Sequence, residues 1–316
     1  MLKIKYTKKF DRNKYYENIS KKYLYISKDE LLKANIKNHS NSTITLEEIF
    51  NYFKIHKIGN FDTIFQNISF KCLSIGNFRI LQKIKNKIGK KNNEYINLIF
   101  NYTKLQQKKI APFFENNLEI STCYYCNIDF VNTYNTKNGK KNKFTLDHYF
   151  DKSTYPYLAL SLYNLIPSCY TCNSKLKGTK EFANLAPSSQ KYNFKDKVKF
   201  KLKMSDSCKN LHIKNKNDIE INLRENYSND FKNFIEKMHL DDRYRIHKDI
   251  VYNMIIKAEL YPQSRLKELQ DLTGIPFQQI KKDIFNLIDE NEDLSKQPFS
   301  KLIVDMSKEL KILWSY

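Results

Sequence analysis

Glycine and long apolar runs are scarce in this chain of 316 residues. Only six glycines are present, and none belongs to a Gly-rich loop of the kind that cradles the phosphates of ATP. No apolar run reaches the roughly 18 residues that a transmembrane helix needs. Residues 1–5 lack the apolar core of a signal peptide. We therefore expect a cytoplasmic protein that makes no membrane contact and relies on a partner for any ATP hydrolysis.

Acidic side chains are in the minority. Lys and Arg number 55 against 34 Asp and Glu, which gives a net charge of +21. Residues 241–316 carry 12 basic and 13 acidic side chains, so the excess lies within residues 1–240. A basic surface attracts polyanions through counterion release, although the joint abundance of Asn, Lys, Ile and Tyr is also typical of an AT-rich genome. We expect any surface that faces a nucleic acid to lie within residues 1–240.

Two Cys-x-x-Cys pairs account for four of the six cysteines: Cys123 and Cys126, then Cys169 and Cys172. Four thiols in two such pairs are typical of a tetrahedral Zn²⁺ site. The zinc would be structural, because four sulfur ligands leave no position for water or substrate. Thiols stay reduced in the cytosol, which favours metal binding over disulfides. The remaining Cys72 and Cys208 are expected to be buried free cysteines.

The segment between the two pairs predicts a strand, a loop, a second strand and a helix. Residues 143–148 alternate apolar and polar side chains, and this strand ends in the pair Asp147-His148. Residues 165–167 indicate the second strand, and a helix from Cys169 to about residue 177 would end at Gly178.

In that arrangement the Asp147 carboxylate and the Asn173 amide oxygen would converge on one hard cation. Oxygen ligands with open positions suit Mg²⁺ or Mn²⁺, which would hold a scissile phosphate. His148 would point to the other face of the strand. Since the reference pKa of histidine is about 6.5, His148 suits the role of general base for an attacking water.

Residues 123–178 resemble an HNH endonuclease domain of the ββα-metal, or His-Me finger, superfamily, and we call this segment the finger. The matching residues are, in order, Asp147-His148, Asn164-Leu165, Cys169-Tyr170-Thr171-Cys172-Asn173 and Lys177-Gly178. The resemblance implies that His148 is the general base and that Asp147 binds the catalytic metal. It also implies that Asn164 braces the loop carrying the catalytic histidine.

Asn173 stands where the second metal ligand of the family is often a histidine, so the finger resembles the HNN variant. An oxygen-only site should favour Mg²⁺ or Mn²⁺ over transition metals. Three lysines of the finger are candidates for contact with the substrate phosphate, with an ordinary solvated face as the alternative: Lys152, Lys175 and Lys177.

These features and the resemblance predict a metal-dependent HNH endonuclease that hydrolyses double-stranded DNA. The resemblance implies that cleavage leaves a 5′-phosphate and a 3′-hydroxyl. The resemblance further suggests an effector of anti-phage defence, working with an ATPase or sensor protein and restrained by a partner or by self-assembly. Two alternatives remain open. One is an RNA-directed nuclease or toxin, and the other is a non-catalytic, zinc-stabilised module that only binds nucleic acid.

The expected fold class is α+β, a mostly helical chain with an embedded finger stabilised by the four-cysteine zinc site. Three regions are expected: helical residues 1–115, a nuclease domain with an adjoining basic β segment over 116–224, and helical residues 225–316.

Three helices are predicted in the first of these regions. A capping box at Thr45 begins a helix that runs through about His56. Further helices are predicted over residues 76–88 and over residues 93–114.

Beyond the finger, residues 197–204 alternate lysine with apolar residues and predict a strand paired with one near residues 211–213. Its lysine-rich face would either follow a phosphate backbone or protect an edge strand against aggregation. Residues 266–285, with a break near Gly274, are spaced like a helix-turn-helix or a packed α-hairpin. In the first case four side chains could face DNA: Gln278, Gln279, Lys281 and Lys282.

Overall fold

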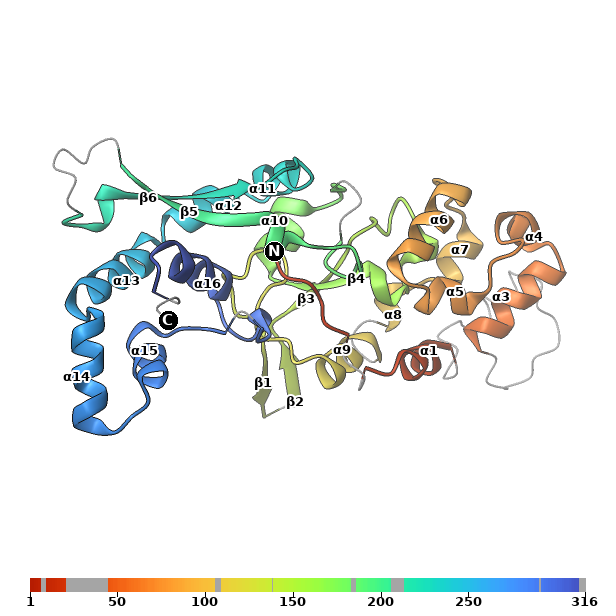
Figure 1. The fold of residues 1–316 in the computed structure, drawn as a ribbon. Coiled ribbons are helices and arrows are strands. Elements are labelled where there is room, and N and C mark those ends of the chain that lie inside the picture. Colours follow the sequence, from red (N-terminus) through yellow and green to blue (C-terminus); the bar gives the residue numbers. More distant parts are fainter. Residues whose placement is uncertain are drawn as a thin grey trace. The chain divides into compact units, whose positions relative to one another are not determined.

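The computed structural model describes residues 1–6, 10–20, 45–105, 109–137, 139–182, 186–205, 213–289 and 291–312. Within these ranges the chain is mostly helical and has three two-stranded antiparallel sheets (Figure 1). The expected α+β class is therefore confirmed. No helix in the described part of the chain is long and apolar enough to cross a membrane.

Residue contacts divide the chain into two compact units. The first, which we call the finger unit, comprises residues 3–120 and 131–192. The second, the ribbon unit, comprises residues 1–2, 121–130 and 193–316. The three regions expected from the sequence remain a prediction, and each unit is described by itself.

The finger unit begins with helices and ends with the strands of the finger. Its α-helices are α1 (Arg12–Ser20), α3 (Leu46–Ile55), α4 (Phe61–Ile64), α5 (Phe70–Ile75), α6 (Phe78–Ile88), α7 (Glu94–Ile99), α8 (Tyr102–Leu105) and α9 (Ala111–Asn117). Its strands are β1 (Thr133–Thr136), β2 (Gly139–Asn142), β3 (Thr145–His148) and β4 (Leu165–Ser168), and a π-helix, η5 (Thr171–Lys177), follows β4.

The capping box predicted at Thr45 is present at the start of α3. The Thr45 side chain accepts a hydrogen bond from the Glu48 backbone N–H, and the Glu48 carboxylate accepts one from the Thr45 backbone N–H. The predicted apolar side of this helix is buried. The predicted helix over residues 76–88 is also confirmed as α6, whose first turn is capped by the Asn77 side chain.

A single helix over residues 93–114 was a wrong expectation, because the chain forms α7, α8 and α9 there. Pro112 lies in the first turn of α9, and residues 109 and 110 directly before it are π-helical. The helical pattern is broken at residues 100 and 101, between α7 and α8. The expectation for Cys72 was wrong as well, since its side chain is exposed on α5. Cys208 lies outside the described residues.

The loop between β3 and β4 is held by the helices that precede the finger. The Tyr15 hydroxyl of α1 donates to the Leu160 carbonyl at 2.9 Å, and the Tyr157 hydroxyl donates to the Gly89 carbonyl at 2.8 Å. The Phe150 ring stacks on Phe78 of α6 with ring centroids 5.2 Å apart. The N-terminal helices thus form one core with the finger strands.

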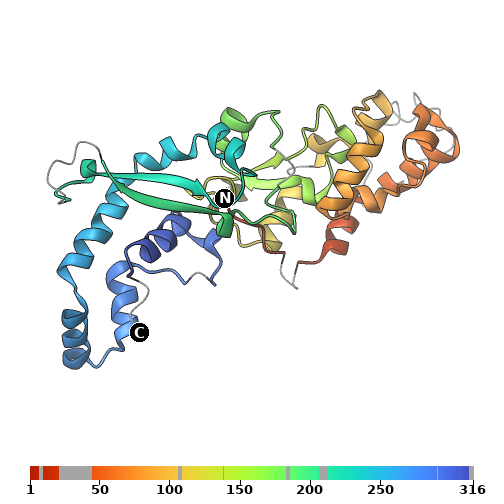
Figure 2. The same cartoon turned by 45° about the horizontal axis from the view of Figure 1, so that its top comes forward.

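The ribbon unit is built on a long two-stranded ribbon that Figures 1 and 2 show in green and teal. Its elements are α10 (Phe194–Lys197), β5 (Val198–Met204), β6 (Ile219–Glu225), α11 (Lys232–Lys237), α12 (Leu240–Arg245), α13 (Lys248–Leu260), α14 (Gln263–Thr273), α15 (Phe277–Phe285) and α16 (Ser300–Glu309).

The predicted strand over residues 197–204 is confirmed as β5, and the prediction of a partner near residues 211–213 falls mainly on residues that the structure does not describe. The partner is β6, in antiparallel register from Val198 opposite Glu225 to Met204 opposite Ile219. The alternating apolar side chains of β6 are buried, which sets this register. Residues 211 and 212 lie outside the described part of the chain.

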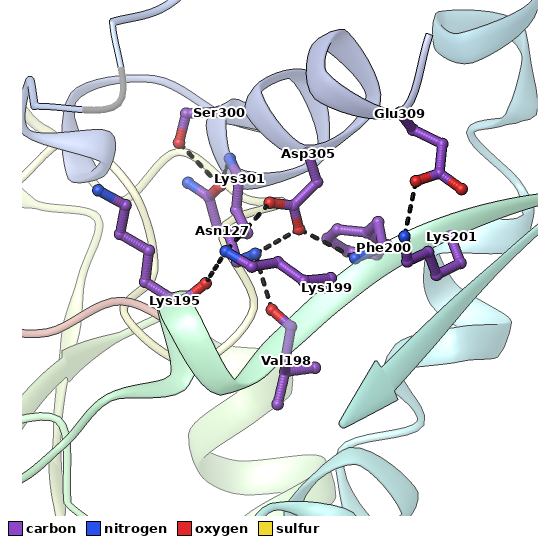
Figure 3. Close-up of polar contacts among 10 residues, drawn as sticks. All are labelled: Asn127, Lys195, Val198, Lys199, Phe200, Lys201, Ser300, Lys301, Asp305 and Glu309. Carbon is purple, nitrogen blue, oxygen red and sulfur yellow. Dashed lines mark hydrogen bonds and ion pairs between the residues drawn. The ribbon is translucent and has the colours of Figure 1, made fainter. Parts of the chain in front are cut away.

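The lysine-rich face of β5 is directed at acidic groups of α16 (Figure 3). Lys201 Nζ lies 2.7 Å from Glu309, and Lys199 Nζ lies 4.0 Å from Asp305. Asp305 also accepts a hydrogen bond from the Phe200 backbone N–H at 2.9 Å and pairs with the buried Lys301. These two β5 lysines therefore make internal ion pairs.

Helices α14 and α15 form a hairpin around Gly274, which ends α14 in the left-handed conformation (Figure 2). This confirms the predicted break at that glycine. Lys281 is buried, so the expectation that it faces DNA was wrong. Gln278, Gln279 and Lys282 are exposed.

Candidate functional site

The four cysteines of the two pairs lie together, and all are buried. Their sulfur atoms all lie within 4.8 Å of one another. Four thiolates around one Zn²⁺ lie about 3.8 Å apart, so the cluster needs only a small contraction to fit a tetrahedral ion. The predicted cluster is therefore confirmed as a set of ligands that can hold a metal such as zinc.

Backbone amides support two of these sulfurs. The Ile128 N–H donates to Cys126 Sγ at 3.4 Å, and the Cys172 N–H donates to Cys169 Sγ at 3.4 Å. Each contact places a donor near a thiolate, which stabilises negative charge on the sulfur. Metal binding requires that charge, because the thiolate is the ligand form.

The loop after Cys126 is fixed by Asn127, which is buried in the left-handed conformation at φ 55°. Its Oδ1 accepts from the Ser300 hydroxyl at 2.9 Å and from the Lys301 N–H at 3.1 Å (Figure 3). Its Nδ2 donates to the Gln297 carbonyl at 3.0 Å. Sequence reasoning missed Asn127, although an Asn directly after a Cys-x-x-Cys pair is a signal for a left-handed turn.

The finger has the predicted order of strand, loop, strand and helix. Strands β3 and β4 pair antiparallel, with His148 opposite Leu165 and Thr145 opposite Ser168. The segment after β4 is a π-helix, in which hydrogen bonds join residues five apart. The Gly178 N–H accordingly donates to the Asn173 carbonyl at 2.8 Å. π-Helical turns are rare and occur frequently at functional sites.

Asn164 ties together the two ends of the loop that follows His148. Its Oδ1 accepts from the Phe150 N–H at 2.7 Å, and its Nδ2 donates to the carbonyls of Phe150 and Leu158 at 3.0 Å each. Its own carbonyl accepts from the Tyr149 N–H at 2.9 Å. Asn164 is fully buried, so no water competes for these hydrogen bonds.

The His148 ring is buried and held by one hydrogen bond, from Nε2 to the Ala159 carbonyl at 3.0 Å. A carbonyl oxygen only accepts, so Nε2 carries the proton and Nδ1 keeps its lone pair in the neutral ring. Burial, with a contribution from the Lys152 charge, lowers the pKa of His148 to about 3. His148 is thus an unprotonated base at neutral pH.

One face of β3 is contacted by side chains of η5. The Asn173 Nδ2 donates to Thr145 Oγ1 at 2.9 Å, and Lys177 Nζ lies 3.2 Å from Asp147 Oδ1. Thr145 and Asp147 are two residues apart, so their side chains share this face of the strand. Asn173 and Lys177 of η5 thus contact Thr145 and Asp147 on the same face of β3.

The three lysines of the finger have different environments. Lys177 is fully buried, and its ammonium also donates to the His148 carbonyl at 2.8 Å. Lys152 and Lys175 are exposed. Lys152 Nζ lies 5.1 Å from the centre of the Tyr102 ring, and Lys175 Nζ lies 5.8 Å from the centre of the Tyr170 ring. Only these two lysines can meet a phosphate that approaches through solvent.

Tyr102 of α8 is a site residue that sequence reasoning missed. Its ring packs edge-on against His148 with centroids 4.4 Å apart, and its buried hydroxyl has no hydrogen-bond partner among the described residues. Burial raises the pKa of Tyr102, and the negative charge of Asp147 raises it further, so the hydroxyl keeps its proton as a donor beside that carboxylate. No local motif marks Tyr102, because it reaches the finger only through the tertiary fold.

Searches of family models, curated proteins and solved structures found no match for this chain. The arguments about function therefore start from the side chains and their geometry.

Proposed function

We propose that the protein is a metal-dependent HNH endonuclease that hydrolyses phosphodiester bonds of double-stranded DNA. The observation that supports this proposal is the order of elements: Asp147 and His148 end β3, Asn164 directly precedes β4, and Asn173 lies in η5. Its support is chemical as well. The finger combines the buried neutral imidazole of His148 with two side chains that carry oxygen ligands, Asp147 and Asn173. The side chain of Asn164 holds the loop after His148 by hydrogen bonds.

His148 is the general base of the proposed reaction. Its Nε2–H is engaged by the Ala159 carbonyl, so Nδ1 is the atom that takes the proton from the attacking water. Asn164 acts through the backbone. It fixes the peptides on both sides of the loop, and thereby the distance between the His148 ring and Ala159.

Asp147 and Asn173 are the proposed ligands of the catalytic cation. A hard divalent ion suits them, because a carboxylate and an amide oxygen are the ligands that Mg²⁺ and Mn²⁺ prefer. When bound, that ion would stabilise the charge developing on the phosphate and its leaving oxygen. Lys152 and Lys175 are exposed lysines of the finger and are proposed to contact the phosphate backbone.

The metal proposed for the four thiols is a structural Zn²⁺. All four ligand positions of a tetrahedral ion would be filled by sulfur, which leaves no position for substrate. As biological setting we propose an effector of anti-phage defence in the cytoplasm, with an ATPase or sensor as partner. This setting is argued by analogy with the HNH resemblance.

The test is plasmid cleavage by purified protein with Mg²⁺ or Mn²⁺, comparing wild type with His148→Ala at equal zinc content. We expect nicking or linearisation by wild type and a loss of at least about a hundredfold in the variant, the usual contribution of a general base. Lys83→Gln, at an exposed position of α6, serves as the control and should cleave like wild type. Matched DNA and RNA duplexes then identify the substrate. Equal cleavage by wild type and His148→Ala would refute the assignment of the base, and nucleic-acid binding without cleavage would favour a binding module.

A further inference from the structure

Lys177 occupies an unusual position for a lysine. Its side chain is fully buried, and its ammonium lies 3.2 Å from Asp147 Oδ1 and 2.8 Å from the His148 carbonyl. A buried ammonium is costly to desolvate and is tolerated when a carboxylate balances its charge. Asp147 is also buried, so the two charges depend on each other.

Helix geometry explains how Lys177 reaches this carboxylate. The π-helical turn of η5 brings Asn173 and Lys177, four residues apart, to the same face of β3. The Lys177 ammonium thus pairs with the Asp147 carboxylate, and Asp147 and Asn173 are the proposed ligands of the catalytic cation. A cation supplied by the chain itself already pairs with the carboxylate that a divalent ion would use.

We propose that Lys177 is a built-in counter-ion of the metal site, which balances Asp147 in the metal-free protein and weakens the binding of a divalent cation. The inference rests on the proposed function, because it takes Asp147 as a metal ligand. Its physical basis is repulsion between cations. An ion of charge +2 about 5 Å from an ammonium is repelled enough, even at the dielectric constant of water, to weaken binding by about tenfold.

This arrangement has two consequences for the finger. Without metal, Asp147 is held in place and its burial remains tolerable, so the finger can fold before it binds a divalent ion. With metal, half-occupancy of the site requires a higher ion concentration, because the ion must overcome the charge of Lys177. Lys177 is therefore a positioning residue that sets the metal affinity.

The test measures Mn²⁺ binding without DNA, by isothermal titration calorimetry and by the electron paramagnetic resonance signal of free Mn²⁺. Lys177→Gln removes the charge and keeps a hydrogen-bond donor toward the His148 carbonyl. We expect it to bind Mn²⁺ at least about tenfold more tightly than wild type. Lys175→Gln, an equal change in net charge on the exposed side of η5, should leave the affinity unchanged. Asp147→Asn should abolish binding in either background.

The outcomes separate this inference from the proposed nuclease activity. A folded Lys177→Gln protein whose Mn²⁺ affinity is equal to or weaker than that of wild type would overturn the inference, even if wild type cleaves DNA. Tighter binding would support it, even if no cleavage is observed. If Lys177→Gln folds only in the presence of Mn²⁺, the ion has replaced the lysine charge, which also supports it. Failure to fold at any Mn²⁺ concentration would overturn it, because only the fixed ammonium could then balance Asp147.

Discussion

Replacing Asn164 should strongly destabilise the finger. The side chain makes three hydrogen bonds, to the Phe150 N–H and to the carbonyls of Phe150 and Leu158, and it is fully buried. Each lost hydrogen bond costs about 1 kcal/mol, and each buried group left without a partner adds to that cost. We therefore expect Asn164→Ala to lower the free energy of unfolding by about 3–5 kcal/mol.

Asn164→Asp tests which half of the amide matters. The aspartate keeps an oxygen for the Phe150 N–H but turns a second oxygen toward two carbonyls, where Asn164 had donated. It should therefore lose about as much stability as the alanine variant, despite its nearly identical shape. Asn135→Ala, at an exposed position of β1, is the control and should change stability by no more than about 0.5 kcal/mol.

The assay is urea-induced unfolding followed by circular dichroism at pH 7.5, with the zinc content of each protein measured beforehand. The slope of the unfolding free energy against urea concentration is compared between the proteins, because it reports the surface exposed on unfolding. A loss below about 1 kcal/mol in Asn164→Ala would refute the reasoning, since it would show that the loop satisfies its own backbone groups without this side chain. An aspartate variant as stable as wild type would refute the donor assignment.

Three further predictions concern metal, pH and packing. Elemental analysis should find one zinc per chain in wild type and distinctly less in Cys172→Ser, because an alcohol is a poor zinc ligand. Equal zinc contents would contradict the four-cysteine zinc site. Because the pKa of buried His148 is about 3 and that of an unfolded histidine is about 6.5, the unfolded chain binds one more proton at pH 5.5. When the pH is lowered from 7.5 to 5.5, the free energy of unfolding of wild type should therefore fall by about 1.4 kcal/mol more than that of His148→Gln. Equal losses in the two proteins would contradict a buried neutral His148 ring. Tyr102→Phe removes a buried hydroxyl without a partner, so its melting temperature should stay the same or rise, and a clear decrease would show that the hydroxyl is bonded.

The parts of the fold that were predictable are those encoded by short-range signals. The capping box at Thr45, the alternation that ends at His148 and the glycine after η5 each act over a few residues, and each element formed where predicted. Errors arose where tertiary packing selects among local options. The helix predicted over residues 93–114 is interrupted at residues 100 and 101, and β5 pairs with β6, which sequence reasoning had not named as its partner.

The two Cys-x-x-Cys pairs and the order of Asp147, His148, Asn164 and Asn173 can be read directly from the chain, because ligand chemistry and motif spacing are local properties. Which nitrogen of His148 carries the proton depends on the fold, since the Ala159 carbonyl that accepts its hydrogen bond lies across the loop. The tertiary structure also placed Tyr102 against His148 and the Lys177 ammonium on Asp147. Burial and electrostatics act between residues far apart in sequence, so the charge state of the site is set by the fold that encloses it.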